Sequence, residues 1–132
     1  MSTTPPIHTG TVCGAPVRFF RSPINDGRPD FAWCALNDIL AAYGARPEMA
    51  EWCRREIRKD FPQTATIATA EGIAVIVPHG AALAVIEAED ELRGVTTIWG
   101  FVRAAHEAYA LLAPDASLET IVAAACRWGA VA

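Results

Sequence analysis

The basic side chains of the chain cluster in one short stretch and indicate contact with an anionic surface. The candidate nucleic-acid contacts are Arg28, Arg46, Arg54, Arg55, Arg58 and Lys59. Arginine and lysine neutralise phosphates, so clustered bases are the expected footprint of nucleic-acid binding. Arg54 and Arg58 are one helical turn apart and could contact neighbouring phosphates, while Arg28 stands at the tip of an expected turn. An alternative stays open, because bases also collect at the end of an ordinary helix to offset its dipole.

A second candidate site is acidic and lies in the other half of the chain. It consists of Glu87, Glu89, Asp90 and Glu91. Such a patch could mimic the phosphates of a nucleic acid and occupy a basic groove on a partner protein. The alternative is a solvated helix end. Residues 1–60 hold eight of the eleven bases against seven acids, and residues 61–132 hold three against eight. The two halves therefore carry about +1 and −5, and we expect them to face different partners.

The residues that could perform catalysis do not form a recognisable motif. Cys34, His79 and Asn37 or Asp38 could be combined as a thiol hydrolase site, since a histidine can activate a thiol. Cys34, however, lies in an apolar stretch with no glycine motif for an oxyanion hole. Phosphate-binding loops, nucleophile elbows and zinc-protease motifs are absent from the sequence. We therefore expect a protein that is not an enzyme, and we keep a cysteine hydrolase as a remote alternative.

The cysteines and histidines give no metal-binding spacing. They stand at Cys13, Cys34, Cys53, Cys126, His8, His79 and His106, without a CxxC or CxxH pair. We expect no metal and no cofactor. The apolar settings of three of these cysteines favour reduced thiols and a cytoplasmic location. No apolar run approaches the roughly 18 to 20 residues of a membrane span, and the first residues do not resemble a secretory signal, so we expect a soluble protein.

The elements that must position these residues begin with a hairpin. Two apolar runs, at 17–20 and 31–36, flank a cluster of Asn25, Asp26, Gly27 and Pro29. These turn residues supply the backbone angles of a chain reversal. A short helix should follow at 38–43, capped by Asn37 or Asp38 and ended by Gly44.

A charged helix over 47–59 carries the basic cluster. Pro47 suits the first turn, and the acids and bases at its two ends match the helix dipole. The expected buried stripe is Met49, Trp52, Cys53, Glu56 and Ile57. We expect the tryptophans at 33, 52, 99 and 128 to lie mainly in the core.

The rest of the chain predicts a second hairpin and three more helices. Thr64–Thr69 and Ile73–Val77 flank the turn at Glu71-Gly72, and the second run is apolar enough for a strand covered on both faces. Residues 81–92 predict a helix. Helices follow at 98–112, capped by Thr96 or Thr97, and from Leu118 to Gly129, capped by Ser117. The apolar stripes of these last two helices indicate an antiparallel pair that either packs on the domain or forms a homodimer.

Together these elements predict an α+β fold of two β-hairpins with packed helices, followed by a C-terminal antiparallel helix pair. The expected organisation is a flexible arm at 1–11, a mixed domain at 12–93 and a helical hairpin at 94–132. A chain of 132 residues with 52% apolar composition can bury a core of its own.

Residues 12 to 92 resemble the Bro-N domain, the antirepressor-type module of phages, prophages and large DNA viruses. The resemblance rests on VRFF, NDGRP, FAWCAL and the helix at 38–44, and on the later segment IAVIVPHGAALAVIEAE. It implies a DNA-associated regulatory protein of phage or prophage type, with double-stranded DNA as its partner. The alternative, drawn from the acidic residues, is an inhibitor that binds a host defence or regulatory protein.

Overall fold

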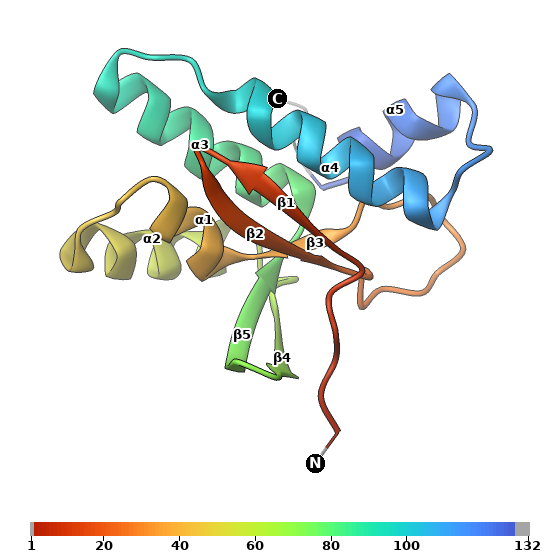
Figure 1. The fold of residues 1–132 in the computed structure, drawn as a ribbon, viewed down its shortest axis with the longest axis horizontal. Coiled ribbons are helices and arrows are strands. Elements are labelled where there is room, and N and C mark those ends of the chain that lie inside the picture. The colour runs from red at the N-terminus through yellow and green to blue at the C-terminus, as the bar shows by residue number, and fades with distance from the viewer. Residues whose placement is uncertain (1, 129–132) are drawn as a thin grey trace.

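The computed structural model describes residues 2–128. The strands are β1 (His8–Val12), β2 (Ala15–Phe20), β3 (Trp33–Ala35), β4 (Ala65–Thr69) and β5 (Gly72–Val77). The helices are α1 (Leu36–Ala42), α2 (Pro47–Asp60), α3 (His79–Arg93), α4 (Ile98–Leu112) and α5 (Leu118–Cys126). The predicted α+β class is confirmed, with the C-terminal helices α4 and α5 adjacent (Figure 1).

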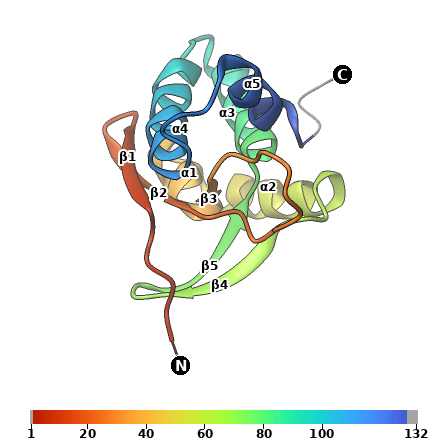
Figure 2. The same cartoon turned by 90° about the vertical axis from the view of Figure 1, so that its right-hand side faces the viewer.

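The strands form one antiparallel sheet in the order β1-β2-β3-β5-β4. Tight turns join β1 to β2 and β4 to β5, with Val12 opposite Ala15 and Thr69 opposite Gly72. The short strand β3 connects the two hairpins, because Cys34 pairs with Phe19 on one side and with Val77 on the other. Beyond this junction the β4–β5 hairpin projects away from the helices (Figure 2).

The main core lies between one face of this sheet and the helices α1, α3 and α4. Phe19 of β2 packs against Phe101 of α4, with 5.9 Å between ring centroids. Helix α4 lies so close to β1 that a Cβ added to Gly10 would stand 2.6 Å from the Cβ of Ala104. A smaller cluster of Phe20, Trp33, Ala35 and Ile76 occupies the opposite face of the sheet.

The opening hairpin is confirmed in its pairing and corrected in its turn. Strands β2 and β3 do pair, but residues 21–32 form a long loop rather than a tight turn. Phe31 and Ala32 are buried without joining a strand. Their apolar side chains serve the core, which is why they looked like part of a strand in the sequence.

The expected flexible arm at 1–11 is wrong for its last residues. His8–Val12 is strand β1, which pairs along its whole length with β2. The backbone of Thr4 also donates to the carbonyl of Ala68, at 2.8 Å. Gly10 and Val12 are buried, whereas Thr9 and Thr11 are exposed, which is the alternation of an edge strand with one buried face. The strand was missed because Gly10 supplies no apolar side chain.

The predicted cap of α1 is wrong. Neither Asn37 nor Asp38 precedes α1, which starts at Leu36 without a side-chain cap. The Asp38 carboxylate instead accepts two hydrogen bonds from the Arg18 guanidinium, at 2.8 and 3.1 Å, and so joins α1 to β2. The predicted left-handed Gly44, with φ of 60°, is confirmed.

The predicted start of α2 at Pro47 is confirmed, but its buried stripe is not. The buried residues are Ala50, Cys53 and Ile57. Met49 and Trp52 stay 37% and 49% exposed. The prediction for β5 is also only partly right, because Ile73 at its start is exposed.

Candidate functional site

The basic residues of α2 divide into those with partners and those without. The Arg54 guanidinium donates to Oδ1 of Asn37, at 3.1 and 3.2 Å, and lies 3.3 Å from the Glu51 carboxylate. Lys59 lies 3.3 Å from Glu56. Arg54 therefore ties α2 to α1, and its charge is largely committed within the molecule.

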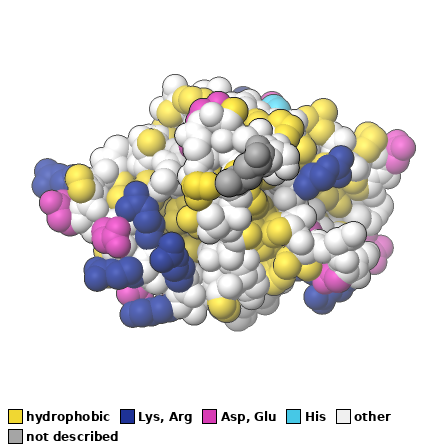
Figure 3. Space-filling view, turned by 90° about the horizontal axis from the view of Figure 1, so that it is seen from below, with side chains coloured by type: hydrophobic (Ala, Val, Ile, Leu, Met, Phe, Trp, Pro, Cys, Tyr) yellow, Lys and Arg dark blue, Asp and Glu magenta, His cyan; other side chains and the backbone are white. Residues whose placement is uncertain are grey.

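Arg46, Arg55 and Arg58 are exposed and have no ion pair among residues 2–128. Figure 3 shows basic side chains gathered at the α2 end of the molecule, with acidic side chains beside them. Helix α2 holds four bases and four acids, so its net charge is zero. This balance reduces the attraction of the helix for phosphates.

The structure does not bring Arg28 to this surface. Arg28 lies in the 21–32 loop, which Figure 1 shows in orange at the opposite end of the long axis from α2. Its guanidinium is 3.1 Å from the Asp26 carboxylate. Arg28 and the α2 bases therefore cannot contact one short segment of ligand together.

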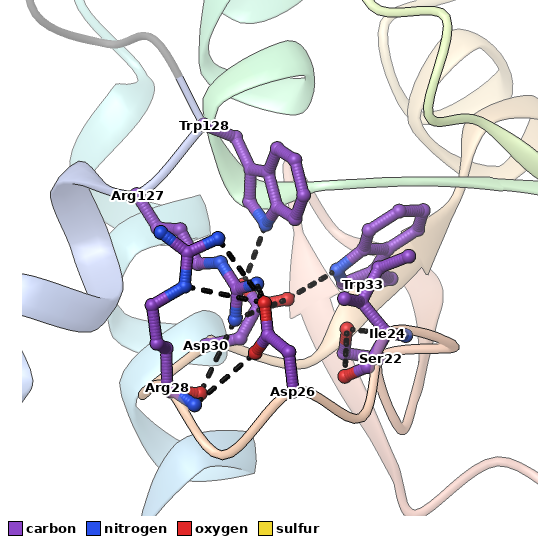
Figure 4. Close-up of polar contacts among 8 residues, drawn as sticks. All are labelled: Ser22, Ile24, Asp26, Arg28, Asp30, Trp33, Arg127 and Trp128. Atoms are coloured by element: carbon purple, nitrogen blue, oxygen red, sulfur yellow. Dashed lines mark hydrogen bonds and ion pairs between the residues drawn. The ribbon is translucent and has the colours of Figure 1, made fainter.

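The loop around Arg28 is held by the end of the chain, a feature that the sequence did not reveal. Figure 4 shows Arg127 paired with Asp26, and Asp30 accepting hydrogen bonds from both Trp33 and Trp128, at 3.0 and 2.9 Å. The two indole rings meet edge to face, 5.8 Å apart. The contacts of Arg127 and Trp128 join residues about a hundred positions apart, so no local pattern could predict them.

The predicted acidic patch is wrong as a single surface, because two of its four members are buried. Glu89 pairs with Arg93, at 3.4 Å. Asp90 accepts hydrogen bonds from the backbone N–H and the hydroxyl of Thr97, at 2.7 and 2.6 Å, and so caps α4. Burial alone would raise its pKa, but these hydrogen bonds hold the pKa of Asp90 below its ordinary value. Only Glu87 and Glu91 are exposed.

An open apolar groove lies between α2 and α3. This groove of about 880 Å³ is lined by Glu48, Met49, Trp52, Ala88, Glu91 and Leu92. Trp52 and Leu92 expose 49% and 70% of their surface. We refer to this feature as the α2–α3 groove. Surface apolar side chains that gather in a concave site favour a binding function over a structural one.

The groove continues along both helices. A second hollow of about 130 Å³ adjoins it and shares Trp52 and Ala88. Its other lining residues are Cys53, Glu56, Ile57, Asp60, Phe61, Ala84 and Val85. The start of α2 faces the end of α3 and the end of α2 faces the middle of α3, so the helices run antiparallel along the groove. Small alanines on α3 leave the space that larger side chains would fill.

The charges at the groove are all negative. Glu48 and Glu91 stand at one end, and Glu56 and Asp60 at the other. No lysine or arginine is among its lining residues, and Glu48 and Glu91 have no ion pair within residues 2–128. Sequence reasoning missed this site because Met49 and Trp52 were assigned to the core. A second helical stripe, formed by Ala50, Cys53 and Ile57, was also visible in the sequence. It can bury one face of α2 while Met49 and Trp52 stay exposed, and it could have revealed the site.

The thiol hydrolase residues are not arranged for catalysis. Cys34 is fully buried, and this burial raises the pKa of its thiol, which opposes formation of a thiolate. His79 lies between Phe31 and Phe101, with ring centroids 4.6 and 5.4 Å away. Burial lowers the pKa of His79 to about 4, and Asp38 is occupied by Arg18.

The four cysteines are free thiols, with Cys13 and Cys126 exposed. Within residues 2–128, no three His, Cys, Asp or Glu side chains are grouped so that they could hold a metal ion. No helix in the same range combines the length and the apolar character that a membrane crossing requires.

Comparison with protein-family models, with curated proteins and with solved structures finds no match to this chain. The Bro-N resemblance thus stays a prediction based on the sequence segments that suggested it.

Proposed function

We propose that this protein is a non-enzymatic regulatory protein that acts by binding another protein in the α2–α3 groove. The observation that carries the proposal is the groove itself, in which Met49, Trp52 and Leu92 remain exposed although the chain has an extensive core. A tryptophan at the centre of a concave apolar site is a typical interface anchor, because it buries a large area on binding.

The proposal revises the acidic inhibitor predicted from the sequence. The acidic surface is supplied by residues of both α2 and α3, and Glu91 is its one member from the predicted patch. A host defence or regulatory protein remains the proposed kind of partner. The predicted cytoplasmic location and the homodimer through residues 94–132 stay predictions.

Affinity capture from cells of the native host tests the proposal. The wild-type chain is compared with Trp52→Ala and with Trp99→Ala, which removes a 71% exposed tryptophan outside the groove. We expect a partner that is retained by the wild type and by Trp99→Ala and lost with Trp52→Ala. Equal capture by all three proteins, or none by any, contradicts a groove-binding function.

DNA association is a second candidate, which Arg55 and Arg58 favour because they are exposed and form no ion pair within residues 2–128. The Bro-N resemblance implies the same activity, in an antirepressor of phage or prophage type. In a mobility shift assay at low salt, the double variant Arg55→Ala/Arg58→Ala should lose duplex binding, while Arg103→Ala on α4 should retain it. A wild-type protein that leaves the duplex unshifted even at low salt excludes this candidate.

A further inference from the structure

We propose that the occupant of the α2–α3 groove is an amphipathic α-helix of the partner protein, with basic residues at both ends of its apolar stripe. This inference rests on the proposed function and specifies the chemistry of the partner segment.

The length of the groove suits a short helix. Its lining on α2 runs from Glu48 to Asp60, which at about 1.5 Å per residue corresponds to roughly 18 Å. A ligand helix of about twelve residues, or three turns, spans this distance. The groove lies between two antiparallel helices, so a third helix can place its side chains along the same direction as both walls.

The floor of the groove is apolar and uneven. Met49, Trp52 and Leu92 are large, whereas Ala84 and Ala88 are small, so the groove offers recesses beside a raised indole. Apolar residues at positions i, i+3 or i+4, and i+7 of a ligand helix would enter these recesses. Because no strand edge borders the groove, an extended peptide would gain no backbone hydrogen bonds there.

The charges select a basic ligand. Glu48 and Glu91 at one end and Glu56 and Asp60 at the other place carboxylates at both ends of the apolar floor. Of the second pair, Glu56 lies 3.3 Å from Lys59. Glu48 and Glu91 have no ionic partner within residues 2–128. Lysines or arginines that flank an apolar stripe would complement these carboxylates, and an acidic helix or a nucleic acid would be repelled.

Selection from a displayed peptide library tests this assignment. The library holds sixteen-residue peptides built on a helix-favouring framework, with all positions that face one side randomised. Selection is performed on the wild-type chain, after removal of peptides that bind Trp52→Ala. We expect enriched peptides to carry apolar residues at helical spacing and Lys or Arg at both ends of this apolar stripe. Enrichment of acidic or non-periodic peptides, or no enrichment over the Trp52→Ala chain, overturns the assignment.

A matched pair of variants then separates charge from shape. Glu48→Gln/Glu91→Gln keeps the size of both side chains and removes their charge, and Glu107→Gln on α4 is the control outside the groove. We expect the groove variant to bind the selected peptides about tenfold more weakly, with a reduced dependence on salt. Unchanged affinity contradicts the role of the carboxylates.

Different results would contradict the proposed groove-binding function and the proposed helical ligand. If native-host capture depends on Trp52 but the library yields no basic helix, a partner protein binds in the groove and the helical class is wrong. If capture does not depend on Trp52, the proposed function itself is wrong.

Discussion

Two sides of this molecule pack very differently. On the β1–α4 side, the backbone of Gly10 lies directly against Ala104, and Phe19, Phe31, His79 and Phe101 fill the space beneath. On the α2 side, the helix is anchored by Ala50, Cys53 and Ile57, and it leaves Met49 and Trp52 at an open groove. The close side buries its apolar side chains, whereas the loose side keeps apolar surface exposed. We therefore expect stability and the proposed binding to depend on separate parts of the chain.

The largest effect on stability is expected at the close side. Gly10→Ala would place a methyl group 2.6 Å from the Ala104 Cβ, and neither atom can rotate away. We expect a loss of about 3 kcal/mol in the free energy of unfolding. Denaturant unfolding measures this loss. The double variant Gly10→Ala/Ala104→Gly should be more stable than the summed losses of the two single variants predict, because removing the Ala104 methyl group relieves the clash. Losses that simply add would show that β1 and α4 are not in close contact.

Ile57→Ala tests which face of α2 is anchored. Ile57 is 6% exposed and packs in the main core, so its truncation should cost about 2 kcal/mol. Met49→Ala should cost less than about 0.5 kcal/mol, because Met49 is 37% exposed at the groove. Thermal or denaturant unfolding of the two variants compares them directly. If Met49→Ala lowered the free energy of unfolding more than Ile57→Ala does, Met49 would belong to the buried face, as the sequence predicted.

The buried imidazole of His79 should make the close side sensitive to acid. Its pKa is lowered to about 4 by burial and by the nearby His106, against about 6.5 in an unfolded chain. Between these two pKa values the unfolded state therefore binds more protons than the folded state. The contribution of neutral His79 to the free energy of unfolding is fully present above about pH 6.5 and is lost as the pH falls below it. We expect His79 to account for a loss of about 2 kcal/mol between roughly pH 7 and pH 5. His79→Phe should flatten this dependence, and an unchanged slope would refute it.

Arg54→Ala should have a small effect. The ion pair with Glu51 and the hydrogen bonds to Asn37 are partly exposed, and exposed pairs contribute about 0.5 kcal/mol. Unfolding curves at low and high salt check this value. A loss several times larger would mean that the α1–α2 contact is more important for the loose side than the structure suggests.

Trp52→Ala should have the smallest effect on stability and the largest on partner binding. The exposed indole contributes little to the core, so unfolding should change by less than about 0.5 kcal/mol. As an interface anchor it should weaken binding of the captured partner by about thirtyfold. Calorimetric unfolding and a binding titration of the same variant test both expectations. A strongly destabilised protein would place Trp52 in the core after all.

Local patterns predicted most of the elements but fewer of their contacts. Pro47 and Gly44 marked helix ends correctly, because their backbone preferences act within a few residues. Strand β1 was missed, since an edge strand with a central glycine has little apolar signal. The cap of α1 was misassigned, because Asp38 is engaged by Arg18. Thr97 does stand at the N-cap of α4, but its own side chain makes no capping hydrogen bond, and Asp90 of the preceding helix accepts from its N–H.

The candidate site was less predictable than the fold. Two overlapping stripes on α2 have helical spacing, one with Met49 and Trp52 and one with Ala50. The sequence favours the first because its side chains are larger, but the second is the one that is buried. The predicted acidic residues form a run in the sequence, but Glu89 and Asp90 are buried and only Glu91 of that run lines the groove. The other acids of the groove, Glu48, Glu56 and Asp60, lie on α2. A helix turns by about 100° per residue, so neighbours in sequence point in different directions and a run of like charges is not a surface.

The sequence by itself determined the α+β class, the positions of five helices and two hairpins, and the basic and acidic halves. Only the tertiary structure decided which side of α2 is buried, that Trp128 meets Trp33, and that a groove lined by apolar and acidic residues separates α2 from α3. The physical reason is the distance along the chain over which each effect acts. Backbone preference and helical period act within one or two turns, whereas burial depends on elements that lie far apart in the chain.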